Sequence, residues 1–213
     1  MKILIVDDHA IMRDGLRAIL AREPDLEVVG EAHDGREAVE QALSLAPDIV
    51  LMDISMPGLN GVEATRRIRE ARASARVIGL SMHADPSYVR AMFAAGADAY
   101  LLKNAAAEEL LLAVRAVAER RSYVSPVVAE RMGDGGSDAG PRGGRSPGDL
   151  SARQREVLQL LAEGKTSKEV AVQMDIAVST VETYRRQIME RLDLHTVAEL
   201  TKFAVRHGLT SIE

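Results

Sequence analysis

The chain has 213 residues, a formal net charge of -5 at pH 7 and 46% hydrophobic residues. This length suits one large domain or two small ones, each with a buried core of its own. No apolar run is long enough to span a bilayer and no secretory leader opens the chain, so we expect a soluble cytoplasmic protein with no membrane partner. The absence of cysteine excludes disulfides, thiolate metal ligands and a cysteine nucleophile.

In the first part of the chain, short β-type runs alternate with amphipathic segments of helical period, which is typical of a parallel sheet covered by helices on both faces. The expected strands are 2–6, 27–31, 48–52, 77–80 and 99–102. The expected helices lie near 10–22, 36–46, 61–71, 87–95 and 106–120. We therefore predict an α/β doubly wound domain over 1–122, with five parallel strands in the flavodoxin-like order 2-1-3-4-5.

The composition changes after this domain. Residues 133–149 are rich in Gly, Pro, Ser and Asp, so we predict a linker over 123–149 that is disordered around 133–149. From 150 to 213 the pattern is helical only. Capping-box spacings from Ser151 to Gln154 and from Thr166 to Glu169 predict the starts of two helices. A third helix is expected to begin near Val178 and a fourth near Thr196. These helices predict a small all-α domain with a helix-turn-helix over 150–213.

Acidic residues and one lysine follow three of the expected strands. Asp7 and Asp8 follow the first strand, Asp53 follows the third and Lys103 follows the fifth. Each residue alone has an ordinary alternative role as a helix cap, a loop residue or a solvated surface group. Because the carboxyl ends of parallel strands meet at one edge of a sheet, we expect the four side chains to lie together. Clustered carboxylates favour a hard cation such as Mg2+, and the set predicts phosphoryl transfer to an aspartate.

Residues 1–122 resemble the receiver domain of bacterial two-component response regulators. The resemblance rests on DD at 7–8, LMDISMPGLNG around Asp53, Ser81 after the fourth strand, and YLLKN at 100–104. It implies that Asp53 is the phospho-acceptor. It also implies that Lys103 pairs with the acyl phosphate, and that Ser81 and Tyr100 act as the switch that responds to it.

The same resemblance implies a metal cofactor, Mg2+ or Mn2+. Its ligands would be Asp8, Asp53 and the backbone carbonyl of Ser55, and Asp7 would hold a metal-bound water. The nearby His9 is not expected to bind Mg2+, because this ion prefers oxygen ligands.

Residues 150–213 resemble the DNA-binding domain shared by LuxR-type and NarL/FixJ-type regulators. The segments that carry the resemblance are LSARQREVLQLLAEGKTSKEVA, STVETYRRQIMERLDL and AELTKFAVRHGL. Within the expected third helix, the spacing of Val181, Tyr184, Ile188 and Leu192 predicts a core face. The opposite face is then available for the major groove of DNA.

The resemblance implies a role for seven polar residues of this domain. Those expected at base edges are Glu182, Thr183 and Arg186, and those expected at phosphates are Lys165, Lys168, Thr180 and Arg185. Glu182 has an alternative role, because Ser179-x-x-Glu182 is a capping-box spacing and Glu182 is also placed to pair with Arg186.

Two departures from the family pattern stand out. Ala177 lies where the family usually has Ser, so we expect the helix cap to shift toward Ser179, and Tyr184 lies where the family often has His. After residue 148 the chain has nine Lys and Arg against ten Asp and Glu. A monomer should therefore bind DNA weakly and depend on dimerisation.

The whole chain is identified as a NarL/FixJ-type response regulator rather than an enzyme. A sensor histidine kinase would phosphorylate Asp53, and the phosphorylated homodimer would bind double-stranded promoter DNA to regulate transcription, with RNA polymerase as a further candidate partner. The alternative is a phosphorylation-independent regulator that uses the receiver only for dimerisation. A flavin- or nucleotide-binding enzyme is disfavoured, because the loop DDHAIM has no glycine to cradle a phosphate.

Overall fold

The computed structural model of the protein describes residues 1–71, 73–134 and 150–210. The chain divides into two compact units, within residues 1–136 and 137–213. Across the described ranges, no helix is both long enough and apolar enough to cross a bilayer.

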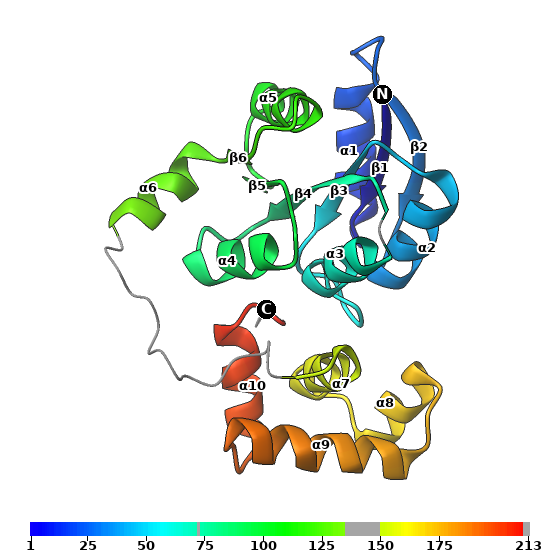
Figure 1. The fold of residues 1–213 in the computed structure, drawn as a ribbon, viewed down its shortest axis with the longest axis vertical. Helices are drawn as coiled ribbons and strands as arrows, with labels where there is room; N and C mark the ends of the chain where they lie inside the picture. The colour runs from blue at the N-terminus through cyan, green and yellow to red at the C-terminus, as the bar shows by residue number, and fades with distance from the viewer. Residues whose placement is uncertain (72, 135–149, 211–213) are drawn as a thin grey trace. The chain divides into compact units, whose positions relative to one another are not determined.

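The first unit is a parallel sheet with helices on both faces (Figure 1). Its strands are β1 (Lys2–Val6), β2 (Glu27–Ala32), β3 (Ile49–Asp53), β4 (Arg76–Ser81), β5 (Ala99–Leu102) and β6 (Tyr123–Val124). Its helices are α1 (Ala10–Leu20), α2 (Gly35–Leu45), α3 (Gly61–Glu70), α4 (Pro86–Ala94), α5 (Ala107–Ala118) and α6 (Pro126–Asp134). The five predicted strands and five predicted helices are confirmed, each within two residues at both ends.

The strand order is β2-β1-β3-β4-β5-β6, so the predicted order of the first five strands is confirmed. The predicted number of strands is wrong, because β6 adds a sixth at the edge beside β5. This strand has only two residues, Tyr123 and Val124, which is too short for an alternating pattern to be visible in the sequence. β6 forms because the edge of β5 is available for pairing, and the local sequence pattern of residues 123–124 contains no information about that edge.

Two apolar layers cover the sheet because successive strand residues point to opposite faces. On one face, alternate residues of the strands, such as Ile3 and Ile5, pack with apolar residues of α1 and α5. On the other face, residues such as Leu4 and Val6 pack with apolar residues of α2, α3 and α4 (Figure 1). The central strands are buried on both faces, which leaves their carboxyl ends as the place where polar side chains gather.

Residues 123–134 differ from the predicted linker, since they form β6 and α6 and belong to the first unit. The domain limits 1–122, 123–149 and 150–213 otherwise remain predictions. The stretch predicted to be disordered, 133–149, lies outside the described residues except for its first two positions, which end α6.

The second unit contains α7 (Ala152–Ala162), α8 (Ser167–Met174), α9 (Val178–Leu192) and α10 (Val197–Arg206). The two predicted capping boxes are present, at Ser151 and Thr166, and Thr196 forms a third. The prediction that Ser179 caps α9 is wrong. Ala177 has the extended backbone of an N-cap (φ -69°, ψ 145°), so the helix begins at Val178 and Ser179 already lies inside it.

Candidate functional site

Three side chains from three strand ends meet at the carboxyl edge of the first unit's sheet. Asp7 follows β1, Asp53 ends β3 and Lys103 follows β5. The Nζ atom of Lys103 is 2.8 Å from Oδ2 of Asp7 and 2.8 Å from Oδ2 of Asp53. The three side chains are 6%, 0% and 1% exposed, for Lys103, Asp7 and Asp53 respectively. The predicted convergence of these residues is therefore observed.

The strand register explains why they meet. β1 and β3 pair in parallel with Val6 opposite Met52, which sets Asp7 beside Asp53. Lys103 is held from the other side, because its backbone N–H donates to the carbonyl of Ser81 at the end of β4 (2.8 Å). The apolar strands place the charged groups, and the charged groups need no long loop to reach one another.

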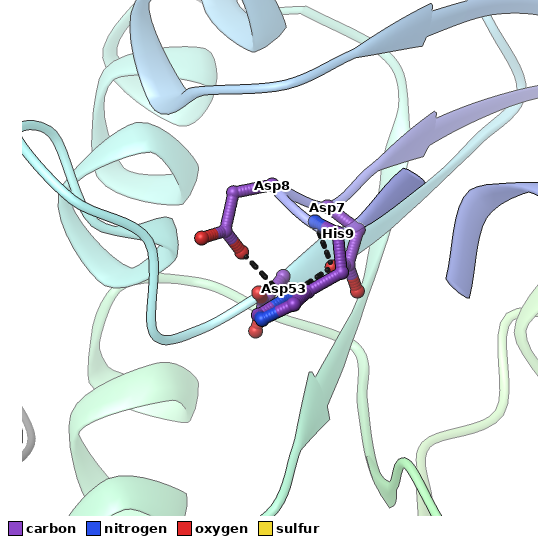
Figure 2. Close-up of side chains that lie close together, drawn as sticks. All are labelled: Asp7, Asp8, His9 and Asp53. Carbon is purple, nitrogen blue, oxygen red and sulfur yellow. Dashed lines mark hydrogen bonds and ion pairs between the residues drawn. The ribbon is translucent and has the colours of Figure 1, made fainter. Parts of the chain in front are cut away.

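Asp8 and His9 complete a cluster of possible metal ligands (Figure 2). His9 Nδ1 lies 3.0 Å from Oδ1 of Asp8 and 3.2 Å from Oδ1 of Asp7. One ligand atom from each of Asp7, Asp8, His9 and Asp53 lies within 4.8 Å of all the others. The set fits a divalent cation, because Asp8 adds a third carboxylate to the two that Lys103 contacts, and carboxylate oxygens are the ligands that hard cations prefer.

Burial dominates the electrostatics of the cluster. It raises the pKa of Asp53 to about 6; the Lys103 ammonium opposes this rise and the Asp7 carboxylate adds to it. Burial alone would lower the pKa of Lys103, but Asp53 and Asp7 outweigh it, so the pKa of Lys103 is raised and the side chain stays an ammonium. A bound cation would favour the charged form of Asp53, since a metal is the largest local charge in such a site.

Ser81 and Tyr100 are both fully buried and share a contact with the backbone of His83. Ser81 Oγ accepts a hydrogen bond from the His83 N–H (3.0 Å), and the Tyr100 hydroxyl donates to the His83 carbonyl (2.6 Å). Burial raises the pKa of Tyr100 to about 12, so its hydroxyl remains a donor. The sequence did not reveal this use of His83, because both contacts involve main-chain atoms that every residue type possesses.

Ser55 lies in the loop after β3, as expected. Its backbone N–H donates to Oδ1 of Asp53 (3.1 Å), which orients the carboxylate. Both oxygens of Asp53 therefore have a neighbour, Ser55 on one side and Lys103 on the other.

In the second unit, α9 has the predicted core face. Val181, Ile188 and Leu192 are buried, and Tyr184 packs against the same apolar cluster. Among the residues predicted to face DNA, Glu182, Arg186, Lys165 and Lys168 are exposed and Thr180, Thr183 and Arg185 are half-buried.

The exposed side of α9 borders a hollow of about 530 Å³. Its lining residues are Glu182, Arg185, Arg186, Met189, Glu190, Asp193, Leu194 and His195. Glu182 Oε2 lies 4.0 Å from Arg185 Nη1, so its nearest basic partner is Arg185 rather than the Arg186 suggested by spacing. The hydroxyl of Thr183 donates to the carbonyl of Ser179 (2.9 Å).

Known families match both units. The family described as response regulator receiver domain matches residues 3–115, and the family described as bacterial regulatory proteins, luxR family, matches residues 149–204. Response regulator UvrY of Escherichia coli K12 is 36% identical over 214 residues, covering 100% of this chain and 97% of that protein. Transcriptional regulatory protein LiaR of Bacillus subtilis is 37% identical over 215 residues, covering 99% and 100%.

Solved structures agree with these relatives. A LuxR-family two-component response regulator from Aurantimonas is 38% identical with a TM-score of 0.61, covering 62% of this chain and 95% of that chain. The RcsB response regulator of Salmonella typhimurium is 25% identical with a TM-score of 0.60, covering 95% and 97%. The chain is thus a two-component response regulator with a receiver domain and a LuxR-type DNA-binding domain. It belongs to the NarL/FixJ family of these transcriptional regulators.

Proposed function

We propose that phosphorylation of Asp53 by a sensor histidine kinase, with Mg2+ or Mn2+ as cofactor, controls the binding of promoter DNA by this protein. The observation that supports the proposal most is the buried cluster in which Lys103 lies 2.8 Å from both Asp7 and Asp53, with Asp8 beside them. A structural ion pair needs one acid and one base, whereas this site has three acids. The additional carboxylates have a use if a cation and a phosphoryl group enter.

The proposed reaction transfers a phosphoryl group to a carboxylate oxygen of Asp53. That oxygen attacks phosphorus, the bond from phosphorus to the donor breaks, and an acyl phosphate forms. Asp8, Asp53 and the Ser55 carbonyl would hold the metal, and Asp7 would hold a water bound to it; the metal supplies charge neutralisation of the phosphoryl oxygens. Lys103 already contacts Asp53, so its ammonium is in position to pair with the new phosphate.

Ser81 is suited to respond to the phosphate. Its Oγ accepts from the His83 N–H and its hydroxyl is also hydrogen-bonded to Tyr100, so the proton would turn from Tyr100 to a phosphoryl oxygen when the phosphate is present. The Tyr100 hydroxyl donates to the carbonyl of His83 in the same loop, so a movement of Ser81 would also change the position of Tyr100. These two residues are proposed as the switch that changes a receiver surface, and homodimerisation of the chain would follow from that change.

The proposed DNA contacts are on the exposed side of α9 and near α8. Glu182, Thr183 and Arg186 would face bases in the major groove. Lys165, Lys168, Thr180 and Arg185 would contact phosphates. The Thr183 proton is engaged by Ser179, so towards a base this side chain offers its methyl group or an oxygen acceptor. The solved RcsB relative is described in terms of DNA interaction, which supports the proposal.

Homodimerisation would double the phosphate contacts of a unit that is not basic overall, with half-sites about one helical turn apart. RNA polymerase is a further proposed partner at promoters, and the cytoplasm is the proposed location.

In the alternative function, the receiver serves only to dimerise the chain and Asp53 accepts no phosphate.

The intact mass of the protein after exposure to acetyl phosphate tests the proposal. With Mg2+ we expect one added phosphate on the wild-type chain and on Asp14→Asn, a control at an exposed aspartate. Without Mg2+, or in Asp53→Asn, we expect none. Full incorporation of phosphate in Asp53→Asn would refute Asp53 as the acceptor, and an absence of phosphate in the wild-type chain would favour the alternative function.

A further inference from the structure

The segment from 123 to 134, which we call the docked segment, attaches to the receiver beside Tyr100. Its strand β6 pairs in parallel with β5, with Val124 opposite Tyr100. The backbone N–H of Ser125 donates to the carbonyl of Tyr100 (3.0 Å), and Ser125 is 2% exposed. The segment is therefore fixed to the main chain of the same residue whose hydroxyl reaches His83.

One apolar side chain anchors α6. Val128 is 0% exposed and belongs to the apolar cluster that contains Tyr100 and Tyr88. The helix contacts α4, and Val127, the residue before Val128, is 50% exposed. A helix held by one buried aliphatic side chain and a few backbone hydrogen bonds has little to prevent its release, since short segments with few buried contacts open most easily.

Hydrogen bonds, a ring contact and a shared apolar cluster join this anchor to the phosphoryl-transfer site. Ser81 accepts from the N–H of His83, and the carbonyl of His83 accepts from the hydroxyl of Tyr100. The ring of His83 also stacks on Tyr88, with centroids 4.9 Å apart. Tyr88 and Tyr100 both border the cluster in which Val128 is buried. A movement of Ser81 that keeps these hydrogen bonds would also move His83 and Tyr100, and Tyr100 belongs to the cluster in which Val128 is buried.

We propose that docking of residues 123–134 on the α4–β5 face is energetically coupled to the state of Asp53, and that phosphorylation strengthens this docking. The inference rests on the proposed function. A phosphoryl group that binds the Ser81 hydroxyl would fix the loop at His83 through the hydrogen bond from the His83 N–H. The His83 carbonyl would in turn hold Tyr100 inward, which preserves the apolar cluster in which Val128 is buried. Because the docked segment directly precedes the residues that lead to the second unit, its attachment sets where that connection leaves the receiver.

Hydrogen exchange of the full chain tests the coupling, with the amides of Val128 and Ala129 as reporters because both donate to the Ser125 carbonyl (2.9 Å). Exchange is compared before and after treatment with acetyl phosphate and Mg2+, and the intact mass of the same samples records phosphorylation. In the wild-type chain we expect exchange to slow about fivefold or more, the lower range of measured couplings between sites.

Matched variants separate docking from coupling. Val128→Asp should release α6 and leave exchange fast in both states, whereas Val127→Asp, the same change one residue away at an exposed position, should behave like the wild-type chain. Val128→Ala is the milder variant if Val128→Asp fails to fold, and should give faster exchange than the wild type. Tyr100→Phe keeps the ring but removes the bond to His83, so it should accept phosphate and yet lose the slowing.

The outcomes distinguish the two claims. One phosphate on Asp53 with unchanged exchange at Val128 and Ala129 would overturn the inference and leave the proposed function standing. The same slowing in Tyr100→Phe as in the wild-type chain would also overturn it, because the contact through His83 would then be unnecessary. A wild-type chain that accepts no phosphate would overturn the proposed function and the inference together.

Discussion

The receiver site and the exposed side of α9 use charged residues in opposite ways. At the receiver site the side chains of Asp7, Asp53 and Lys103 are at most 6% exposed, and short ion pairs fix their positions. On α9, Glu182 is 52% exposed and its distance to Arg185 is 4.0 Å, at the limit of an ion pair. The buried charges are therefore already held in one arrangement by their ion pairs, whereas the exposed charges of α9 are free to adjust their side-chain positions when a partner binds.

This difference has an energetic basis. A buried charge is costly to leave unpaired, so its partners and geometry are determined by the fold itself. An exposed pair contributes little to stability, because water and salt screen it. Changes at the receiver site should therefore affect folding and chemistry together, and changes on α9 should affect DNA binding with little effect on folding.

The largest effect on stability is expected from Lys103→Ala. The substitution leaves Asp7 and Asp53 buried without their shared cation, which should cost about 3–5 kcal/mol of unfolding free energy without Mg2+. Urea unfolding followed by tyrosine fluorescence measures this, since three of the four tyrosines lie in the first unit. Lys2→Ala, at an exposed lysine, is the control. A loss below about 1 kcal/mol would place the site with ordinary surface pairs.

The next largest effect is a pH dependence caused by Asp53. Its pKa is 3.8 in the unfolded reference and about 6 in the folded protein, so the folded protein binds an extra proton between these values. The contribution of Asp53 to stability is thus present near pH 4 and is lost as the pH rises through 6, a change on the order of 2–3 kcal/mol.

Asp53→Asn removes this titration. In metal-free buffer, the difference in unfolding free energy between the wild-type chain and Asp53→Asn should therefore shift in favour of the wild type by about 1.4 kcal/mol as the pH falls from 7.5 to 5, roughly half of the full amount. A difference independent of pH would mean that Asp53 stays ionised in the folded protein.

A smaller effect, confined to DNA, is expected from Arg186→Ala. If Arg186 contacts a guanine, its loss should cost about 1–3 kcal/mol of discrimination at one base position. Binding to a duplex that the wild-type chain selects from a random pool, and to variants of that duplex, measures this cost. Lys202→Ala in α10 is the control. Equal losses on selected and random DNA would assign Arg186 to a phosphate contact.

The smallest effect is expected from Thr166→Ala. This substitution removes the capping box of α8, in which Thr166 Oγ1 accepts from the Glu169 N–H, and should cost about 1 kcal/mol. Faster amide exchange across residues 167–174 would report the loss. Ser179→Ala is a suitable control, since Ser179 lies inside α9. An equal effect of both substitutions would show that capping contributes nothing specific here.

The sequence predicted the receiver site well because three long apolar strands carry it. The strand pattern predicts that Asp7, Asp53 and Lys103 lie at strand ends, and the parallel arrangement of the strands brings those ends together at one edge of the sheet. The sequence failed at β6 and α6, where two strand residues and one buried valine contribute too little pattern to detect. Those elements exist because the β5 edge and the α4 surface receive them, which is a tertiary effect.

The contact through His83 was also beyond sequence analysis, because it uses a main-chain N–H and carbonyl. On α9 the core face could be predicted from the spacing of Val181, Ile188 and Leu192. The partner of Glu182 could not, because Arg185 and Arg186 are both within reach of a flexible exposed side chain.

The central claim is that the receiver site controls DNA binding by the second unit. The affinity of the full chain for a selected duplex, measured with and without acetyl phosphate in Mg2+ while the intact mass records phosphorylation, tests it most directly. We expect tighter binding that appears together with one phosphate on Asp53 and with a dimer, and no such change in Asp53→Asn. An unchanged affinity in a sample that carries the phosphate would contradict the claim.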